Sequence, residues 1–353
     1  MKIITIVGAR PQFIKSVPVS RELKKNNIEE VVVHTGQHFD QNMSSIFFDQ
    51  MKISKPNYDL NINSLKHGAM TGQMLERIEE ILCTEKPDFV LVYGDTNSTL
   101  AGSLAASKLN IKLIHVEAGL RSFNLRMPEE INRIVTDRLS SYLFCPTDTA
   151  VNNLEKEGFS SFDCKVFNSG DVMKDAANIF TQFAQKPNID IPDDFILCTI
   201  HRQENTDDAI KLKSILESLN FIGKDRKIVL PIHPRTKKKI LQYGLNSLVN
   251  NNLSLIDPIG YLEMLYLLKN CSLVITDSGG LQKEAFFFHK LCLTLRTETE
   301  WTELVENGFN FICGTEFEVI IENYKNVLKA SPNFDINLYG SGVASKLIVD
   351  EIS

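Results

Sequence analysis

Short runs of β-branched and other apolar residues alternate along the chain with longer amphipathic stretches. Each run is too short for a helix and apolar throughout, which is typical of strands in a parallel sheet covered by helices on both faces. The runs that predict strands are residues 3–7, 30–35, 89–93, 112–117, 195–200, 228–231, 253–256, 273–276, 291–295 and 309–313. The stretches that predict helices include residues 12–25, 70–84, 100–108, 129–139 and 171–185. The alternation therefore predicts an α/β protein with doubly wound sheets.

The alternation is interrupted between residues 169 and 194. The predicted helix in this region runs into KPNIDIPDD at 186–194, a segment with two prolines and few apolar residues. At roughly 100–200 residues per domain, a chain of 353 residues has room for about two domains. We therefore expect two doubly wound α/β domains, residues 1–170 and 171–334, joined near residues 170–190. Ligands of such sheets bind beyond the carboxyl ends of the strands, so the cleft between the two domains is the expected site.

Composition excludes several classes of protein. Apolar residues make up 43% and charged residues 23%, as in ordinary folded domains. The 38 Lys and Arg against 44 Asp and Glu leave a net charge of −6 without a basic block, which argues against nucleic-acid or membrane partners. No apolar run approaches the roughly 18 residues of a membrane span, and MKIITIVGARP predicts a first strand rather than a signal peptide. The seven cysteines are scattered without metal-ligand spacing, which favours reduced thiols in a cytoplasmic protein.

Polar residues follow the first two predicted strands. In GARPQFIK, Gly8 allows a tight turn and brings Arg10 and Lys15 to the start of a helix, where unpaired backbone N–H groups could also meet a phosphate. An ordinary strand-to-helix turn with a solvated Arg and Lys is the alternative. HTGQH follows the second strand, and a histidine in such a place is more often structural than functional. Its polar side chains are His34, Gln37 and His38.

Acidic residues follow the next two predicted strands. Asp95, in GDTNST, stands either at a helix N-cap or at the edge of a site, since Thr96 could cap the helix equally well. The segment HVEAGLRSFNLRMPEEINR is the densest group of charged residues in the chain. Glu117 ends its strand and would face the cleft, whereas Glu129 begins a helix, where an acid also suits the helix dipole. The segment further contains His115, Arg121, Arg126, Glu130 and Arg133, and so many charges together favour a site.

The second half of the chain repeats this pattern. TIHRQEN and PIHPRT follow two predicted strands and bring His201 and His233 to one edge of the sheet. In DSGGLQKEA, the segment from Ser278 through Gly279 to Gly280 begins a helix whose N–H groups can approach a pyrophosphate, although a plain turn is the alternative. Glu284 follows on that helix and could accept hydrogen bonds from two ribose hydroxyls. No GxGxxG or Walker motif is present, which argues against NAD and ATP. These residues predict a two-domain enzyme for an anionic, nucleotide-linked substrate.

Taken together, these segments resemble the non-hydrolysing UDP-N-acetylglucosamine 2-epimerase family. The resemblance spans nearly the whole chain, and the motifs occur in order. They are GARPQFIK at 8–15, HTGQH at 34–38, YGDTNST at 93–99, HVEAGLRS at 115–122, PEEINR at 128–133, HRQEN at 201–205 and DSGGLQKEA at 277–285. The resemblance implies the GT-B-like fold of two Rossmann-like domains, with a C-terminal helix at 342–352 that returns to the first domain, which then includes residues 335–353. It also implies a homodimer.

The resemblance implies reversible inversion at C2 of a UDP-linked 2-acetamido sugar, without a metal, nicotinamide or flavin. A base removes the C2 proton as UDP leaves C1, and UDP then adds back while the other face of C2 is protonated. Matched position by position, the proton-transfer residues are Asp95, Glu117, Glu129 and His201, and which acid serves which face stays open. The charge partners of the sugar or diphosphate are Arg10, Lys15, Arg133 and, as a weaker candidate, His233. The phosphate contacts are Ser278, Gly279 and Gly280, and the ribose contact is Glu284.

The sequence departs from the family pattern in two places. Trp301 stands in LRTETEW where many members have an Arg, and together with GGLQKEAFFF this resembles the branch that acts on UDP-2,3-diacetamido-2,3-dideoxyglucuronic acid. The segment NINSLKHGAMTGQ at 61–73 lacks the Arg of members that a second substrate molecule activates. Both sugars, as precursors of surface polysaccharide, stay open. A hydrolysing epimerase, a glycosyltransferase on the same fold and a nucleotide-sugar sensor are the other interpretations, and the set of acids argues against the last two.

Overall fold

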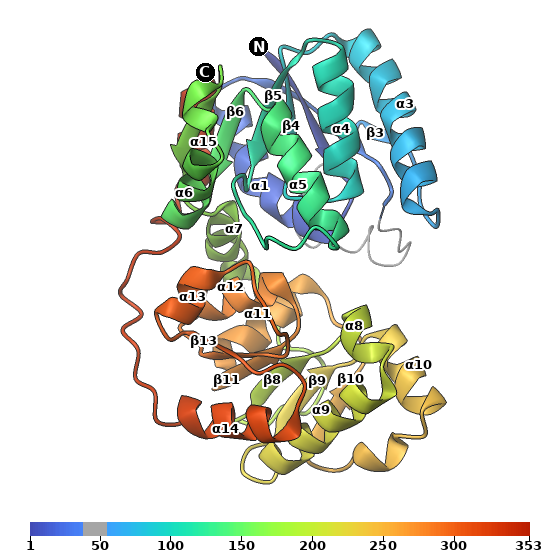
Figure 1. The fold of residues 1–353 in the computed structure, drawn as a ribbon, viewed down its shortest axis with the longest axis vertical. Coiled ribbons are helices and arrows are strands. Elements are labelled where there is room, and N and C mark those ends of the chain that lie inside the picture. Colours follow the sequence, from blue (N-terminus) through green and yellow to red (C-terminus); the bar gives the residue numbers. More distant parts are fainter. Residues whose placement is uncertain (38–54) are drawn as a thin grey trace. The chain divides into compact units, whose positions relative to one another are not determined.

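The computed structural model describes residues 1–37 and 55–353. Contacts within the chain divide it into two compact units (Figure 1). Unit 1 contains Met1–Ile179 together with Asn337–Ser353, and unit 2 contains Phe180–Ile336. Among the described residues, no helix combines the length and the apolar character that crossing a membrane requires.

Unit 1 is built on a sheet of seven parallel strands in the order β3-β2-β1-β4-β5-β6-β7. The strands are β1 (Lys2–Val7), β2 (Glu29–His34), β3 (Tyr58–Asp59), β4 (Phe89–Tyr93), β5 (Lys112–Val116), β6 (Tyr142–Cys145) and β7 (Lys165–Asn168). The chain moves from β1 toward one edge and later resumes at β4 on the other side of β1. The loops after β1 and β4 therefore lie at the switch point, where doubly wound sheets bind their ligands.

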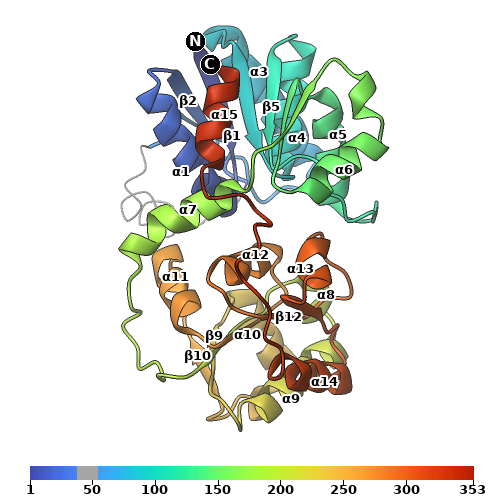
Figure 2. The ribbon, with the colours of Figure 1, turned by 90° about the vertical axis from the view of Figure 1, so that its left-hand side faces the viewer.

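Helices cover both faces of this sheet. They are α1 (Arg10–Lys25), α3 (His67–Glu85), α4 (Asn97–Lys108), α5 (Pro128–Leu139), α6 (Asp148–Lys156), α7 (Val172–Phe180) and α15 (Ala344–Ile352). Helices α3 and α4 pack on one face, where their apolar side chains join Ile4, Ile6, Val90 and Val92 in a single core. The C-terminal helix α15 lies alongside α1 (Figure 2).

Unit 2 has a sheet of six parallel strands in the order β10-β9-β8-β11-β12-β13, with its switch point between β8 and β11. The strands are β8 (Ile196–Thr199), β9 (Ile228–Pro231), β10 (Leu253–Ile256), β11 (Leu273–Thr276), β12 (Cys292–Thr294) and β13 (Asn310–Ile312). The helices are α8 (Gln203–Thr206), α9 (Ala209–Ile222), α10 (Pro234–Gln242), α11 (Tyr261–Asn270), α12 (Gly279–Phe287), α13 (Thr302–Glu306) and α14 (Phe317–Val327).

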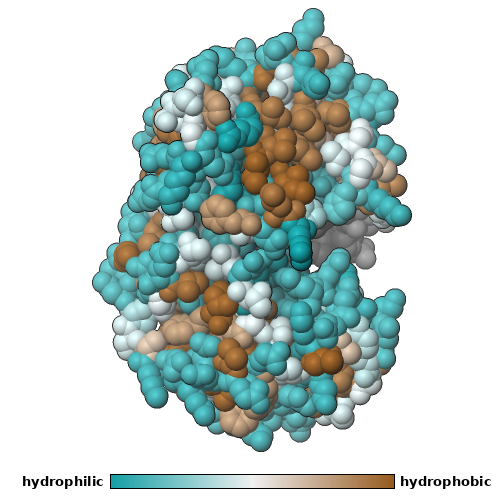
Figure 3. All heavy atoms as spheres, viewed as in Figure 1, coloured by the Kyte–Doolittle hydropathy of each residue, from teal (hydrophilic) through white to brown (hydrophobic). Residues whose placement is uncertain are grey.

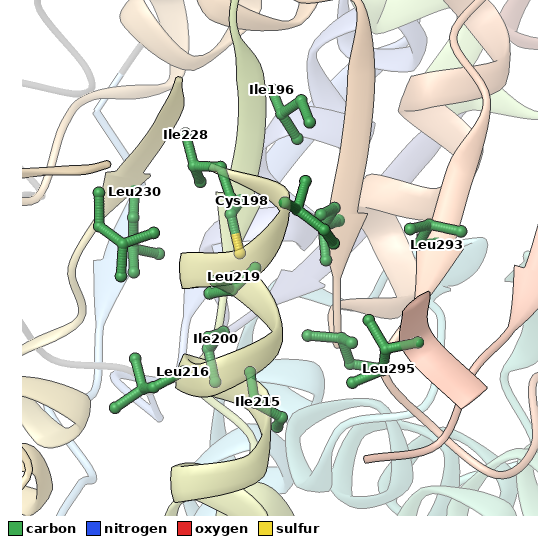
Figure 4. Packing of buried hydrophobic residues seen from close by; sticks show 14 of the residues in the cluster. Ile196, Cys198, Ile200, Ile215, Leu216, Leu219, Ile228, Leu230, Leu293 and Leu295 are labelled. Carbon is green, nitrogen blue, oxygen red and sulfur yellow. The ribbon is translucent and has the colours of Figure 1, made fainter. Parts of the chain in front are cut away.

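The core of unit 2 explains why its strands are continuous apolar runs in the sequence. Ile196 and Cys198 of β8 lie in one buried cluster with Leu216 and Leu219 of α9 (Figure 4). Leu197, between them, belongs to a second buried cluster on the opposite face. Because successive side chains of a strand point to opposite faces, a strand covered on both sides is apolar at every position.

The doubly wound α/β prediction is confirmed, and all ten predicted strands are present with bounds within one residue. The sequence analysis missed α6 and three strands of unit 1: β3 has two residues, β6 has four, and β7 is only partly buried. The helix predicted at 171–185 is wrong in its second half. It ends at Phe180 and is followed by a 3₁₀ turn at Thr181–Phe183, after which the Gln185 N–H donates to the Leu262 carbonyl instead of continuing a helix.

The N-terminus of α15 is capped by a residue of another helix. The Asp175 carboxylate of α7 accepts hydrogen bonds from the Ala344 N–H (3.2 Å), the Ser345 N–H (2.8 Å) and the Ser345 hydroxyl (2.6 Å). Val343, at the N-cap position, offers no side-chain acceptor. Asp175 therefore satisfies N–H groups that helix termini leave unpaired, and it joins the end of the chain to unit 1.

We predict that Asp175→Ala lowers the free energy of unfolding by about 1–2 kcal/mol, because it removes a cap and leaves buried donors unsatisfied. Denaturant unfolding followed by circular dichroism measures this effect. Asp163→Ala, at an exposed aspartate of the same unit, is the matched control and should have little effect. Equal stabilities of the two variants would show that Asp175 does not hold α15.

Candidate active site

Asp95 lies in the loop that joins β4 to α4, at the switch point of unit 1. The Thr96 hydroxyl caps α4 by accepting a hydrogen bond from the Thr99 N–H (3.2 Å). The helix does not use Asp95 as its cap, and the Asp95 carboxylate instead pairs with Arg133 of α5, whose Nε lies 3.1 Å from Oδ2. The Asp95 side chain is 29% exposed and that of Arg133 only 5%. The pair is therefore open to solvent on its carboxylate side.

Glu129 and Glu130 are neighbours in the first turn of α5 but lie in different surroundings. Glu129 is exposed. The buried Glu130 carboxylate accepts hydrogen bonds from the Ser122 N–H (2.9 Å), the Phe123 N–H (2.8 Å) and Arg133 Nη1 (2.9 Å). Glu130 thus orients Arg133 and holds the preceding loop, whereas Glu129 presents its carboxylate at the surface.

Glu117 follows β5 in a left-handed backbone conformation, with φ of +73°. The predicted strand therefore ends one residue earlier than expected, at Val116. A residue with a Cβ pays roughly 1–2 kcal/mol for this conformation, which is typical of functional sites. It is held because the N–H groups of Glu117 and Ala118 both donate to the Phe144 carbonyl (3.0 and 3.1 Å).

The Glu117 carboxylate forms an ion pair with Lys15 of α1. The side chains are 7% and 14% exposed, so water screens this pair much less than a surface pair. Gly94 lies directly against the pair, because a Cβ added there would stand 3.1 Å from Glu117 Oε2 and 3.8 Å from Lys15 Nζ. The loop of Asp95 and the turn of Glu117 are therefore adjacent.

A buried network of charges lies beneath these two turns. His115 Nδ1 is 2.7 Å from Asp137 Oδ1, and Arg121 Nη1 is 2.7 Å from Asp137 Oδ2. Arg121 also binds Glu157 with two nitrogens, at 2.7 and 2.9 Å. Burial alone would raise the pKa of the Asp137 carboxyl, but the hydrogen bonds and charges of His115 and Arg121 outweigh burial and hold this pKa below its usual range.

The loop after β1 is closely packed. A Cβ at Gly8 would lie 2.0 Å from Ser98 Oγ and 2.2 Å from Thr35 Oγ1, so only glycine fits. The N–H groups of Gly8 and Ala9, which precede α1, donate to Gln12 Oε1 (2.8 and 3.0 Å), because the side chain of Gln12 folds back over the loop. Arg10 begins α1 and is partly exposed.

His34, the last residue of β2, and Gln37, which follows the strand, pack against neighbouring side chains. His34 is 7% exposed, packs edge-on against Phe13, and has Nδ1 3.3 Å from Asp59 Oδ1. Burial lowers the pKa of His34, although Asp59 opposes this shift. Gln37 accepts hydrogen bonds from the Ser98 N–H and hydroxyl (3.0 and 2.8 Å). His38 lies outside the described residues.

In unit 2, the buried Asp277 organises the loop after β8. Its carboxylate accepts hydrogen bonds from the His201 N–H (3.1 Å), the Arg202 N–H (3.0 Å) and Asn205 Nδ2 (3.1 Å). His201 Nδ1 lies 3.3 Å from Asp277 Oδ1, and the His201 side chain is 43% exposed. Asp277 therefore holds an exposed imidazole at the switch point of unit 2.

His233 lies near His201, with 6.2 Å between the ring centroids. Its Nδ1 accepts the Arg235 N–H (3.2 Å) and so caps α10. Burial lowers the pKa of His233, and the charges of His201 and Arg235 act in the same direction. Nδ1 is thus occupied as an acceptor, and any proton that His233 donates to a ligand comes from Nε2.

The glycine-rich turn leads into α12, as predicted. The Ser278 hydroxyl caps the helix by accepting from the Leu281 N–H at 3.5 Å. A Cβ at Gly279 would lie 2.3 Å from Glu300 Oε1, whereas Gly280 has open space around it. Gly279 thus packs closely against the Glu300 side chain, and the surface at Gly280 is open to a ligand.

Glu284 and its neighbours complete the described part of this site. Glu284 is buried, and its Oε1 accepts a hydrogen bond from the Tyr261 hydroxyl (2.8 Å), which fixes the orientation of the carboxylate. Lys283 lies with its Nζ 4.0 Å from the centroid of the Trp301 ring. The two segments that together resemble the diacetamido-uronate branch in sequence therefore contact each other in the structure.

The structure brings the predicted residues together within each unit. In unit 1 these are Lys15, Asp95, Glu117 and Arg133, and in unit 2 they are His201 with His233 and the turn that begins at Ser278. Sequence reasoning gave no role to the side chains that hold these groups: Gln12, Glu130, Asn132, Asp137, Tyr261 and Asp277. Except for Asp137 and Tyr261, these residues lie inside the motifs quoted from the sequence. Their place in those motifs was the only signal that could have pointed to them. Within the described residues, no three His, Cys, Asp or Glu side chains are grouped as a metal site would require.

Comparison with known proteins identifies the family. A family profile described as UDP-N-acetylglucosamine 2-epimerase matches residues 21–353. The chain belongs to the UDP-N-acetylglucosamine 2-epimerase family. Members of this family are isomerases that act on UDP-sugars.

Two curated members of the 2-epimerase family illustrate the similarity. The UDP-2,3-diacetamido-2,3-dideoxy-D-glucuronate 2-epimerase of Pseudomonas aeruginosa is 53% identical over 100% of this chain and 99% of its own length. The UDP-N-acetylglucosamine 2-epimerase of Methanocaldococcus jannaschii is 45% identical over 99% of this chain and 98% of its own.

Solved structures of 2-epimerases confirm the GT-B-like fold. The M. jannaschii enzyme in complex with UDP-GlcNAc and UDP matches with a TM-score of 0.92 and 44% identity, over 100% of this chain and 99% of its own. The Neisseria meningitidis enzyme bound to UDP-GlcNAc matches with a TM-score of 0.88 and 35% identity, over 100% of this chain and 99% of its own. A spinosyn rhamnosyltransferase shares the fold alone, with a TM-score of 0.54 and 12% identity over 100% of this chain and 96% of its own.

The left-handed conformation of Glu117 leads to a prediction about the thermal stability of this 2-epimerase. Glu117→Gly should unfold about 2–4 °C above Glu117→Ala, because glycine adopts a positive φ without strain and the difference is about 1 kcal/mol. Differential scanning calorimetry of the two variants measures it. At Glu155, on the exposed surface of α6, the same pair of substitutions should rank in the opposite order. An Ala variant at 117 as stable as the Gly variant would contradict the prediction.

Proposed function

We propose that this chain catalyses the non-hydrolysing C2 epimerisation of a UDP-linked 2-acetamido sugar, of the UDP-GlcNAc/UDP-ManNAc type, for surface polysaccharide synthesis. One observation supports this proposal more strongly than any other. Asp95 and Glu117 follow the neighbouring parallel strands β4 and β5, beside the switch point, and each carboxylate is paired with its own cation. Two oriented carboxylates at adjacent turns suit a reaction that moves protons at one carbon.

The chemistry explains why several acids and cations are needed. The C2 proton of such a sugar is only weakly acidic, so its removal must be coupled to departure of UDP from C1. The elimination produces a glycal and free UDP, and the return of UDP to C1 with protonation on the opposite face of C2 completes the inversion. Each face of C2 needs a proton-transfer group, and the departing diphosphate needs fixed positive charge.

We assign the proton transfers to Asp95, Glu117, Glu129 and His201. Asp95 combines partial exposure with orientation by Arg133, and Glu117 is held in a fixed turn. Glu129 is exposed on the first turn of α5, and His201 presents an exposed imidazole that Asp277 orients. All four residues follow strand ends or begin helices at the carboxyl edges of the sheets, where ligands of such folds bind.

We assign binding of the UDP moiety to unit 2. The Ser278–Gly279–Gly280 turn would contact the phosphates, since Gly280 is open and helix N-termini favour anions. Glu284, oriented by Tyr261, would accept the ribose hydroxyls, and His233 would donate from Nε2 to the diphosphate. Arg10, Lys15 and Arg133 of unit 1 would supply positive charge to the sugar or diphosphate. The proposed reaction uses no metal, nicotinamide or flavin.

A second substrate is favoured by a specific observation. The protein that is 53% identical to this chain is named for UDP-2,3-diacetamido-2,3-dideoxy-D-glucuronate. Lys283 and Trp301, which stand in the segments that resemble this branch, contact each other in the structure. The same C2 inversion on this diacetamido uronate is therefore the second candidate.

Product analysis tests both candidates. The purified protein is incubated with UDP-GlcNAc, and separately with the diacetamido uronate, and the products are resolved by chromatography and proton NMR. We expect the C2 epimer with UDP still attached, from one sugar in strong preference to the other. Free sugar together with UDP would show the hydrolysing reaction instead, and an unchanged spectrum with both sugars would overturn the proposal.

Asp95→Asn should lower kcat for epimerisation by about 10²–10⁴-fold, the usual contribution of a proton-transfer group. The affinity for UDP should change less than about threefold, because Asp95 is not among the proposed UDP contacts, most of which lie in unit 2. Steady-state kinetics and calorimetric titration with UDP measure the two quantities. Asp163→Asn, at an exposed site of the same unit, is the control. A kcat within about threefold of the wild type would remove Asp95 from the catalytic residues.

We propose that the protein is a homodimer that associates through α4 and α5. Apolar side chains gather over these helices (Figure 3), where Leu100, Leu104, Ile131, Ile134 and Val135 are exposed or partly exposed. Helix α4 has no charged residue before Lys108, which is unusual for a helix that faces water. A surface of this kind suits a second copy of the same chain, since a two-fold interface is self-complementary.

Leu104→Arg should therefore halve the mass measured by light scattering at micromolar concentration, because a charge at the centre of the contact is costly to bury. Val319→Arg, on an exposed face of unit 2, should leave the mass unchanged. A wild-type protein that is already monomeric would refute the dimer, and a dimeric Leu104→Arg variant would refute this interface.

We propose a cytoplasmic location. All seven cysteines are unpaired thiols, and five of them are buried. Burial raises the pKa of the Cys271 and Cys313 thiols to about 12, so these groups are inert at neutral pH. A full set of free thiols is typical of a protein in a reducing compartment. The proposed UDP-sugar substrate would also be present there.

A further inference from the structure

Three consecutive carbonyl groups, from the last residue of β4 into the loop that carries Asp95, each accept a hydrogen bond from a side chain of another element. The Tyr93 carbonyl accepts from Gln12 Nε2 (2.7 Å), the Gly94 carbonyl faces His115 Nε2 (2.8 Å), and the Asp95 carbonyl accepts from Asn132 Nδ2 (2.9 Å). The three donors come from α1, β5 and α5. Carbonyl groups of surface loops more often accept hydrogen bonds from water. Here, side chains of the protein hold the backbone at three successive residues.

The three donors are buried side chains with fixed orientations. Gln12, His115 and Asn132 are 2%, 0% and 5% exposed. Gln12 is held from its other end, because its Oε1 accepts the N–H groups of Gly8 and Ala9. Buried donors that are themselves anchored leave little freedom to the group they bind.

His115 is the most strongly determined of the three. Both of its ring nitrogens face acceptors, the Asp137 carboxylate at Nδ1 and the Gly94 carbonyl at Nε2. Asp137 is in turn fixed by Arg121 (2.7 Å) and by the Gly119 N–H (3.2 Å). The Nε2–H of His115 is therefore directed at the Gly94 carbonyl by a chain of buried partners.

The same elements also carry the groups that face the substrate in the proposed reaction. Glu117 follows His115 by two residues, and Arg133, which pairs with Asp95, follows Asn132 directly. A displacement of the loop relative to β5 or α5 would change the separation between Asp95 and these two residues. The three hydrogen bonds therefore fix the position of Asp95 relative to Glu117 and Arg133.

We propose that Gln12, His115 and Asn132 are positioning residues, which hold the Asp95 carboxylate in register with Glu117 and Arg133 by fastening the Tyr93, Gly94 and Asp95 carbonyls. This inference rests on the proposed epimerase activity. Misplacement of a reacting group by about 1 Å can cost on the order of 100-fold in rate. The loss should appear in kcat and not in the binding of UDP.

Two substitutions of His115 separate positioning from general stability. The amide nitrogen of Asn stands near the place of Nδ1 and that of Gln near the place of Nε2, so His115→Asn loses the bond to Gly94 while His115→Gln keeps it. Both variants should be less stable than the wild type. We expect His115→Asn to lower kcat at least tenfold with KM within about threefold, and His115→Gln to restore most of that loss. Equal kcat values for the two variants would overturn the proposal.

A double-mutant cycle with Asp95→Asn tests whether His115 acts through Asp95. If it does, adding His115→Asn to Asp95→Asn lowers kcat by less than about twofold further, because residues that act as a unit are not additive. Losses that multiply would show that His115 acts independently of Asp95 and would overturn the proposal.

Asn132→Ala gives a second measurement if the His115 variants fold poorly. It should lower kcat at least tenfold, whereas Ser140→Ala, which removes a buried hydrogen bond to the Thr136 carbonyl at the other end of α5, should lower only the unfolding temperature. Equal activities of these two variants would count against positioning. A wild-type protein that fails to epimerise either sugar would instead refute the proposed function, so the two failures are distinguishable.

Discussion

A buried chain of polar side chains, from Arg121 through Asp137 to His115, supports the turns of unit 1 that carry Asp95 and Glu117. Charges removed from water are tolerated only when each has a well-placed partner. Asp137 meets this condition by accepting from His115, Arg121 and the Gly119 N–H. The network also holds the turns after β4 and β5, because His115 binds the Gly94 carbonyl and the Gly119 N–H donates to Asp137.

In unit 2, a buried aspartate also holds a loop in place. Asp277 is fully buried at the end of β11 and accepts from the backbone of His201 and Arg202 and from Asn205. In both units a buried aspartate thus organises a loop at the switch point, and the proposed functional side chain extends from that loop. Rigid support of this kind is what general acid–base chemistry requires of its scaffold.

Pattern in the sequence was sufficient for ten of the thirteen described strands, because burial on both faces leaves unbroken apolar runs such as those of β4 and β11. It missed β3, β6 and β7. Functional candidates emerged from the residues that follow these strands. What could not be predicted were partners distant in sequence: Gln12 contacts the Tyr93 carbonyl, and Tyr261 contacts Glu284. Nor does a single sequence show which of Glu129 and Glu130 is buried, since that depends on where the 122–123 backbone runs.

The central claim is that protons leave and return to opposite faces of C2 through different groups. The deuterium content at C2, measured in D2O at less than about a tenth of full conversion, tests it most directly. The account predicts that the epimeric product carries solvent deuterium at C2 while the recovered substrate keeps its original proton. A product that retains the proton of the substrate would show that one group carries it across the ring, and would contradict the account.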